Sequence, residues 1–441
     1  MRRCLPLIAL AALAAGAIAE ESPAERGRKA LETRTFIPAI WSRGAYDKLW
    51  TRWAKEKPAN YEAAVRDTYG LHPAPFPNDG LPMGLRHAMR LFQPGLAVDC
   101  LACHGSSILG KSYPGLGNSS LDVQGVFEDL NAVDGLPGLP FRFSNARGTS
   151  EAGTMSVYLL GKRNPDLSFR RPSVDLGMHD DQCEDVPAWW LLKKKKTMYF
   201  TGGSDARSVR SIMQFMMGSI LGPEGFTKAE ADFADLRQYM LTLEPPKYPY
   251  PVDKPLAAKG EAIFADKCAK CHGSYGASGT YPNKIVPLAE IGTDPKRYDG
   301  ITHAFGEYYN QTWFAQAERN NGPAYKAIES EGYQAPPLDG LWATAPYLHN
   351  GCAPTVYHVL NSKARPKVFT RSFKTGAEDF DSVKLGWKYR ECAPAAASLP
   401  PREQRKVYDT SQPGRGNGGH TYGDALSDEQ RMAVIEYLKT L

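Results

Sequence analysis

The chain has 441 residues, of which 42% are hydrophobic and 23% charged, and its formal net charge is +5. This length predicts two or three domains with hydrophobic cores, and the composition is that of an ordinary globular protein rather than a disordered or fibrous one. The small positive charge gives no indication of nucleic-acid binding. Any functional assignment must therefore come from particular residues.

The first residues have the pattern of a signal peptide. An arginine pair precedes the apolar run 5–18, and Ala17-Ile18-Ala19 is a typical cleavage site. We expect residues 1–19 to be removed, so that the mature protein begins at Glu20 and is periplasmic or secreted. The apolar run is too short to favour a membrane span, and the sequence predicts no span further along the chain.

Residues 20–70 have a helical, aromatic-rich pattern. Tyr46, Trp50 and Trp53 recur at i, i+4 and i+7, which predicts one face of a helix. We interpret this segment as a leader that packs its aromatic side chains on the body of the protein. The proline-rich stretch 72–82 that follows is predicted to be irregular.

A short motif then combines two thiols, two residues apart, with a histidine next in line. Thiols at this spacing add to the vinyl groups of a haem, and the adjacent imidazole ligates the iron. A structural zinc site needs further ligands nearby, and a redox dithiol does not need the histidine. The motif occurs twice, so the sequence predicts two covalently bound c-type haems, haem 1 and haem 2, held by Cys100, Cys103 and His104 and by Cys268, Cys271 and His272.

The glycine- and proline-rich stretch 110–118 follows the first motif and predicts a loop against haem 1. Lys111, Arg142 and Arg147 are available to pair with haem propionates, although each one alone is more often a surface cation. Further on, Trp189 and Trp190 are adjacent. We expect them to wall a haem pocket or to lie between the two haems as an electron path, and core packing is the alternative for at least one of them.

A repeated closing helix indicates two related halves. Residues 227–243 predict a helix with a Thr227/Glu230 capping box, and a similar helix begins at Ser427 with Gln430 in the same register. A proline-rich linker separates the halves. The second half opens with a helix over 257–268, which resembles the first helix of small c-type cytochromes and predicts a contact between Gly260, Phe264 and Tyr437.

The predicted fold class is therefore mainly α, with two cytochrome-c-like helical haem domains and long loops. Residues 20–244 form the first domain with its leader and haem 1. Residues 245–254 form the linker, and residues 255–441 form the second domain with haem 2.

The second axial ligand of each iron decides the function, because a haem with two protein ligands mostly moves electrons and a haem with an open position can bind oxygen or peroxide. After His272 the sequence has one methionine, Met432, and it lies inside the closing helix, where a loop-borne methionine ligand is not expected. Of the later histidines, His303, His349, His358 and His420, the last follows a glycine-rich run that lets the backbone approach a flat cofactor. We assign His420 as the second ligand of haem 2, and a surface histidine is the alternative.

Haem 1 has no such partner in the sequence. The possible ligands are His72, His87, Met155, Met178 and His179, and none has a persuasive setting. We therefore expect haem 1 to be open or only weakly closed. Cys183, Cys352 and Cys392 remain for at most one disulfide, and Cys352–Cys392 is our candidate pair.

The chain resembles the bacterial dihaem c-type cytochrome peroxidase superfamily, in particular its rubber-oxygenase-like branch. The segment 338–351, Leu-Asp-Gly-Leu-Trp-Ala-Thr-Ala-Pro-Tyr-Leu-His-Asn-Gly, is similar to the family's signature loop beside the C-terminal haem. Shorter similarities lie at 145–149, 187–190, 281–285 and 291–295. The resemblance implies an oxygen-binding N-terminal haem on His104 and a bis-histidine C-terminal haem on His272 and His420. The chain lacks the distal histidine and the methionine ligand of the peroxidases.

We interpret the sequence as an exported dihaem oxidoreductase of peroxidase or dioxygenase type, in which haem 1 activates oxygen or peroxide and haem 2 transfers electrons from an organic or protein donor. The alternative is a non-catalytic periplasmic electron-transfer cytochrome with both haems six-coordinate. A haem-based gas sensor is a third hypothesis, and no signalling segment supports it.

Overall fold

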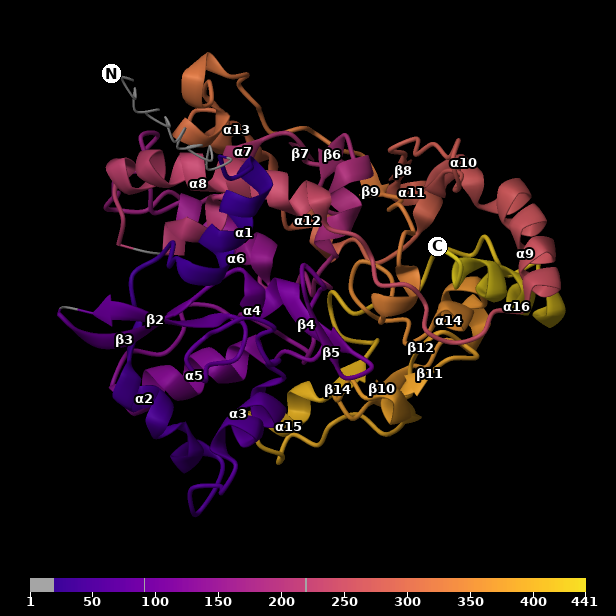
Figure 1. Cartoon of the computed structure of the whole chain (residues 1–441), viewed down its shortest axis with the longest axis horizontal. Coiled ribbons are helices and arrows are strands. Elements are labelled where there is room, and N and C mark those ends of the chain that lie inside the picture. The colour runs from indigo at the N-terminus through magenta and orange to yellow at the C-terminus, as the bar shows by residue number, and fades with distance from the viewer. Residues whose placement is uncertain (1–19, 91, 219) are drawn as a thin grey trace, which may run out of the picture.

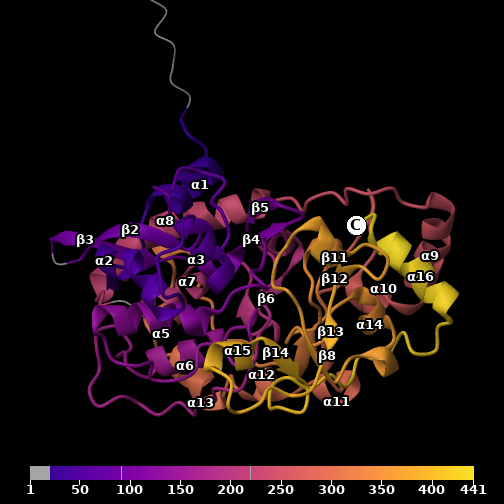
Figure 2. The same cartoon turned by 90° about the horizontal axis from the view of Figure 1, so that it is seen from below.

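The computed structural model describes residues 20–90, 92–218 and 220–441, so the signal-peptide interpretation of residues 1–19 lies outside it. Helices make up 38% of the described residues and strands 13%, which agrees with the predicted mainly helical class. The N-terminal half occupies one side of the molecule and most of the C-terminal half the other (Figures 1 and 2). In the ranges described, no helix is long and apolar enough to cross a membrane.

The α-helices are α1 (Pro23–Thr33), α2 (Arg43–Asp47), α3 (Tyr61–Tyr69), α4 (Leu101–His104), α5 (Val123–Asp134), α6 (Ala152–Leu160), α7 (Val209–Ile212), α8 (Pro223–Thr242), α9 (Lys254–Lys267), α10 (Ala269–His272), α11 (Leu288–Ile291), α12 (Lys296–Asp299), α13 (His303–Tyr309), α14 (Val356–Leu360), α15 (Pro401–Arg405) and α16 (Asp428–Leu438). The strands are β1 (Trp41–Ser42), β2 (Leu85–Arg90), β3 (Gln93–Val98), β4 (Gly105–Ile108), β5 (Lys111–Pro114), β6 (Thr197–Met198), β7 (Ser204–Asp205), β8 (Ile285–Pro287), β9 (Gly332–Gln334), β10 (Val368–Thr370), β11 (Phe380–Asp381), β12 (Gly386–Trp387), β13 (Arg390–Glu391) and β14 (Val407–Asp409).

The strands form small antiparallel sheets between the helices. Two sheets have three strands, in the orders β1-β3-β2 and β13-β10-β14. In the first, Trp41 pairs with Leu96 and His87 also pairs with Leu96 from the other side. The β4–β5 hairpin, in which Ser107 pairs with Ser112, follows the first haem motif directly. The prediction of a loop over 110–118 is therefore wrong for residues 111–114, which form β5 and pair with β4.

Two helix pairs built alike give the two halves their frames. The second pair, α9 and α16, crosses where Gly260 meets the Ala433 carbonyl oxygen, and a Cβ on Gly260 would lie 1.9 Å from that atom. Phe264 and Tyr437 pack beside this crossing with ring centroids 5.3 Å apart. The predicted contact of these three residues is confirmed. The capping box of Ser427 and Gln430 at the start of α16 is also confirmed.

The first pair is α1 with α8, and the sequence did not predict it. A Cβ on Gly27 would lie 2.0 Å from the Asp235 carbonyl oxygen. Gly27 therefore allows the two helix backbones to come into contact, as Gly260 does in the second pair. Helix α1 belongs to the segment interpreted as a leader. It was not identified because a long segment separates it from the first haem motif, whereas α9 runs directly into the second.

Two local predictions are wrong for identifiable reasons. Helix α8 begins at Pro223 rather than Thr227, because proline is favoured in the first turn. Glu230 is buried and binds Arg210 at 2.8 Å instead of capping the helix. The helix face expected at Tyr46, Trp50 and Trp53 is also interrupted, since the Tyr61 hydroxyl donates to the Tyr46 carbonyl and α2 ends at Asp47.

The buried side chains form two main clusters that meet at the adjacent tryptophans. Trp189 belongs to the cluster under α1 and α8, and Trp190 belongs to the cluster under α9 and α16. Residues 301–315, which include α13, leave the C-terminal half and pack into the first cluster (Figure 1). Helix α15 also crosses over, and Arg405 binds Asp122 of the N-terminal half at 2.8 Å. The domain boundary at the linker 245–254 remains a prediction.

Candidate haem-binding sites

The first motif begins on a buried ion pair. Asp99 accepts a hydrogen bond from the Leu101 amide at 2.8 Å and binds Arg86 at 2.7 Å, with both side chains almost fully buried. This pair fixes the start of α4, on which Cys103 and His104 lie. Burial raises the pKa of Cys103 to about 11, which is the opposite of the lowered pKa of a redox-active dithiol. In the described ranges, no group of three or more His, Cys, Asp or Glu side chains is arranged for a metal ion.

His104 is oriented by a backbone carbonyl and an aromatic ring. Its Nδ1 donates to the Pro187 carbonyl oxygen at 3.2 Å, and its ring stacks on Trp189 with centroids 5.1 Å apart. Burial lowers the pKa of His104 to about 4, so the imidazole is neutral. A neutral imidazole whose Nδ1 carries the proton presents Nε2 as a metal ligand.

The second motif has the same arrangement. His272 ends α10, and its Nδ1 donates to the Pro336 carbonyl oxygen at 2.8 Å. The Tyr275 hydroxyl donates to the His272 carbonyl oxygen at 3.0 Å and accepts from the Leu338 amide at 2.6 Å, which ties the motif to the signature loop. Burial also lowers the pKa of His272. Both motif histidines are thus held in the orientation that an axial haem ligand needs.

A cavity of about 230 Å³ opens beside the second motif, and its lining is mostly apolar, as is usual for a cofactor site. Cys268, Cys271, His272 and His420 all line it. The ring centroids of His272 and His420 are 6.3 Å apart. Two imidazoles bound to one metal ion at about 2 Å each would place their centroids roughly 6 Å apart. The predicted pair is therefore brought together at a separation that fits a shared iron.

Three unpaired polar atoms lie in the lining of this cavity. His349 Nε2, Thr293 Oγ1 and Gln334 Oε1 are buried without a hydrogen-bond partner, and all three residues line the cavity. His349 stacks on Tyr333 with centroids 4.2 Å apart. The nearby Arg297 adds positive charge and, with burial as the larger cause, lowers the pKa of His349 to about 3. A haem carboxylate would satisfy the donors His349 Nε2 and Thr293 Oγ1, though not the acceptor Gln334 Oε1. Sequence reasoning considered His349 only as a possible second ligand and as part of the signature loop.

The first motif has no comparable partner in the described ranges, where no second imidazole makes a ring contact with His104. His72 is buried and bonded to Asn118 at 3.1 Å, and His87 is bonded to Arg43 at 2.8 Å. Met178 and His179 are exposed, and Met155 is half-buried on α6. The structure therefore does not bring any of the predicted histidines to His104.

The two adjacent tryptophans pack in different halves of the protein. Trp189 stacks on His104, whereas Trp190 donates from Nε1 to the Asp339 carbonyl oxygen at 2.8 Å in the other cluster. The residues just before and after them, Pro187, Ala188 and Leu191, line the cavity with His272. Both tryptophans are buried, so the core-packing alternative holds for them as well.

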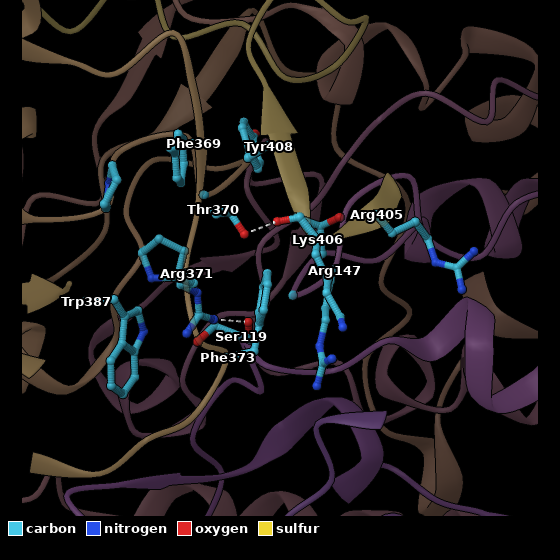
Figure 3. Close-up of a pocket in the computed structure, with 15 residues that line it drawn as sticks. Ser119, Arg147, Phe369, Thr370, Arg371, Phe373, Trp387, Arg405, Lys406 and Tyr408 are labelled. Atoms are coloured by element: carbon cyan, nitrogen blue, oxygen red, sulfur yellow. Dashed lines mark hydrogen bonds between the residues drawn. The ribbon is translucent and has the colours of Figure 1, made fainter. Parts of the chain in front are cut away.

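The three predicted propionate partners differ in burial. Lys111 and Arg142 are at the surface, where Arg142 binds Asn145 at 3.1 Å. Arg147 is buried and donates to the Ser120 carbonyl oxygen at 2.8 Å. It lines a second cavity with Arg371, and the Phe373 ring lies between the two guanidinium groups (Figure 3). This cavity lies where loops of the two halves meet.

The remaining cysteines are not joined in the described ranges, so the candidate disulfide Cys352–Cys392 is not formed in this structure. Cys352 is instead fully buried in a cluster with Cys183 and Tyr408. Sequence spacing could not reveal that Cys183 and Cys352 come close together in the fold.

Comparison with known proteins gives two domain matches. Residues 257–339 match the cytochrome c family, and residues 332–370 match the family described as RoxA-like, cytochrome c-like. The cytochrome c match implies covalently bound c-type haem with its iron. Both matches lie in the C-terminal half.

Two relatives come from Sinorhizobium fredii (strain NBRC 101917 / NGR234). The uncharacterised protein y4iM is 31% identical over 302 residues, which cover 58% of this chain and 64% of the relative. The uncharacterised protein y4iJ is 30% identical over 261 residues, which cover 45% of this chain and 41% of the relative. The chain thus spans less than two thirds of the length of either protein.

Proposed function

We propose that this c-type cytochrome, which is related to RoxA-like proteins, is an exported dihaem oxidoreductase with two unequal haem sites. The first site, on Cys100, Cys103 and His104, is open on its second axial side and takes oxygen or peroxide. The second site, on Cys268, Cys271, His272 and His420, is closed by two histidines and passes electrons. The electron donor is an organic molecule or another protein.

The observation that carries the proposal is the inequality of the two histidines. His272 and His420 line the same cavity with their ring centroids 6.3 Å apart. His104 is oriented in the same way by a proline carbonyl, yet within the described ranges no second imidazole is in ring contact with it. A six-coordinate haem supplies electron transfer, and a haem with an open position supplies oxygen or peroxide chemistry.

The chain's own residues support a division of labour. The Pro187 and Pro336 carbonyls hold the two imidazoles in one tautomer and increase their basicity as ligands. The segment 185–191 connects the sites, because Pro187 binds His104 and also lines the cavity of His272. Trp189, stacked on His104, is the aromatic side chain best placed for an electron path between the sites.

Carbon monoxide binding tests the proposal. The reduced holoprotein is expected to bind one carbon monoxide per two haems, with the other haem unchanged in its absorption spectrum. Haem content per chain is counted in parallel after denaturation. A protein with two haems that binds none would be an electron-transfer cytochrome with both irons closed, and one that binds two would contradict the role of His420.

A further inference from the structure

The loop that carries His420 is pinned to the rest of the protein along its length. Asn350 donates from Nδ2 to the Gly414 and Gly416 carbonyl oxygens at 3.0 Å each, and the Gly416 amide donates to Asp294 at 2.9 Å. The His420 amide donates to the Ile291 carbonyl oxygen at 2.8 Å. The glycine-rich run therefore does not make a freely moving loop.

The glycines allow this loop to cross another backbone segment closely. Gly419 has φ +68°, and a Cβ there would lie 2.2 Å from the Gly292 carbonyl carbon. His420 itself has φ 45°, a left-handed conformation that is uncommon for a residue with a side chain. A histidine in this conformation needs surrounding contacts that hold it there.

One arginine supplies most of these contacts. The Arg365 guanidinium donates from Nη1 to the carbonyl oxygens of Asn417 at 2.6 Å, Gly418 at 3.3 Å and Gly419 at 2.7 Å, and from Nη2 to that of His420 at 3.1 Å. Its Nε donates to the His358 carbonyl oxygen at 2.8 Å, which anchors it to α14. Four consecutive carbonyls, ending at the proposed ligand, thus converge on one side chain.

The hydrogen bonds of Arg365 go to carbonyl oxygens. The residue is 6% exposed, and among the described residues it forms no salt bridge, although the charge of the Asp424 carboxylate acts on it from nearby. Arginine has five N–H donors in a rigid planar group, whereas lysine has three donors on a flexible stem. Lysine therefore cannot reproduce this set of five contacts.

We propose that Arg365 is a positioning residue that holds His420 on the second site and keeps small external ligands away from that iron. The inference rests on the proposed role of His420 and goes further, because it makes His420 a fixed ligand rather than one that moves aside during turnover. The charge-assisted hydrogen bonds to the His420 loop would have to break before the imidazole could leave.

The test uses the holoprotein with Arg365→Lys, Arg365→Gln and His420→Ala. The readouts are the low-spin signals of the oxidised protein in electron paramagnetic resonance and carbon monoxide binding by the reduced protein. Losing one such charge-assisted hydrogen bond changes an equilibrium by about tenfold. We therefore expect each Arg365 variant to increase the fraction of chains that bind a second carbon monoxide by roughly tenfold or more. His420→Ala is expected to bind it fully.

Arg163→Lys is the matched control. Arg163 is also a buried arginine that donates to carbonyl oxygens, those of Leu167, Met217 and Leu221, and it lies in the N-terminal half. It is expected to leave the signals of the second site unchanged.

The outcomes separate the two proposals. If His420→Ala keeps the low-spin signal of the second site, the ligand assignment itself is wrong. If His420→Ala loses that signal and both Arg365 variants keep it and bind no second carbon monoxide, Arg365 does not position His420. If neither Arg365 variant retains two covalent haems, Arg365 is a residue of the fold and the positioning role is overturned.

Discussion

Each motif histidine donates its Nδ1 proton to the carbonyl of a proline, and in this the two sites are alike at the level of single residues. Pro187 and Pro336 occupy equivalent places beside His104 and His272. The sequence predicted both motifs and the His420 partner, because these depend on residue type and spacing. It could not predict that proline carbonyls orient the two histidines or that Arg365 binds the His420 loop. A backbone acceptor has no sequence signature, and in a sequence a buried arginine that binds carbonyls cannot be told from a surface arginine.

Two buried histidines that are not proposed as haem ligands are expected to make the protein sensitive to acid. Burial lowers the pKa of His72 and of His358 to about 4, from an ordinary value near 6.5. Each imidazole stays neutral in the folded protein, whereas in the unfolded protein it takes up a proton below about pH 6.5. Its contribution to the free energy of unfolding is therefore fully present above pH 6.5 and is lost as the pH falls towards 4. A shift of this size corresponds to roughly 3 kcal/mol per histidine.

We expect the melting temperature of the wild-type protein to fall between pH 7.5 and pH 4.5, and His358→Gln to lose less over the same range. A glutamine keeps polar atoms near Thr355 and Tyr389, which bind His358 at 2.8 and 3.1 Å. His179→Gln, which changes an exposed histidine, is the control and should match the wild type. An equal loss in His358→Gln and the wild type would show that His358 is not the cause.

At the scale of elements, the crossing of α1 with α8 repeats that of α9 with α16. A Cβ on Gly27 would lie 2.0 Å from a backbone oxygen of α8, so an alanine there must push the two helices apart. Gly27→Ala is expected to destabilise the protein by about 1–3 kcal/mol, the usual range for overpacking. Thermal unfolding of the holoprotein measures this change.

Gly44→Ala in α2 is the matched control. The nearest atom to a Cβ there is the Ser42 hydroxyl at 3.7 Å, so this substitution fits without strain and improves helix propensity. A melting temperature for Gly27→Ala that equals or exceeds that of Gly44→Ala would mean that α1 does not pack on α8 as described.

The closing helices were predictable because their apolar stripes recur with the helical period. In α8 the apolar side chains of Phe233, Leu236 and Met240 are buried along one face. The role of α1 was not predictable, because nothing local connects a helix at residue 23 to a haem motif at residue 100. The predicted start of α8 at Thr227 was wrong, because Pro223 begins the helix four residues earlier, and Glu230 binds Arg210 instead of capping the helix.

At the scale of the whole molecule, the two halves are interlocked rather than only linked. Residues 301–315 pack into the N-terminal cluster, and α15 places Arg405 on Asp122. The segment 185–191 touches both candidate haem sites. This arrangement would keep two irons at a fixed separation, which suits an enzyme that uses one site for chemistry and the other for electrons.

The central claim is that the two irons are unequal, and electron paramagnetic resonance of the fully oxidised holoprotein tests it most directly. The account predicts one high-spin ferric signal, from the site on His104, and one low-spin signal from the site on His272 and His420, in equal amounts. Two low-spin signals with no high-spin iron would contradict it and would make the protein an electron-transfer cytochrome.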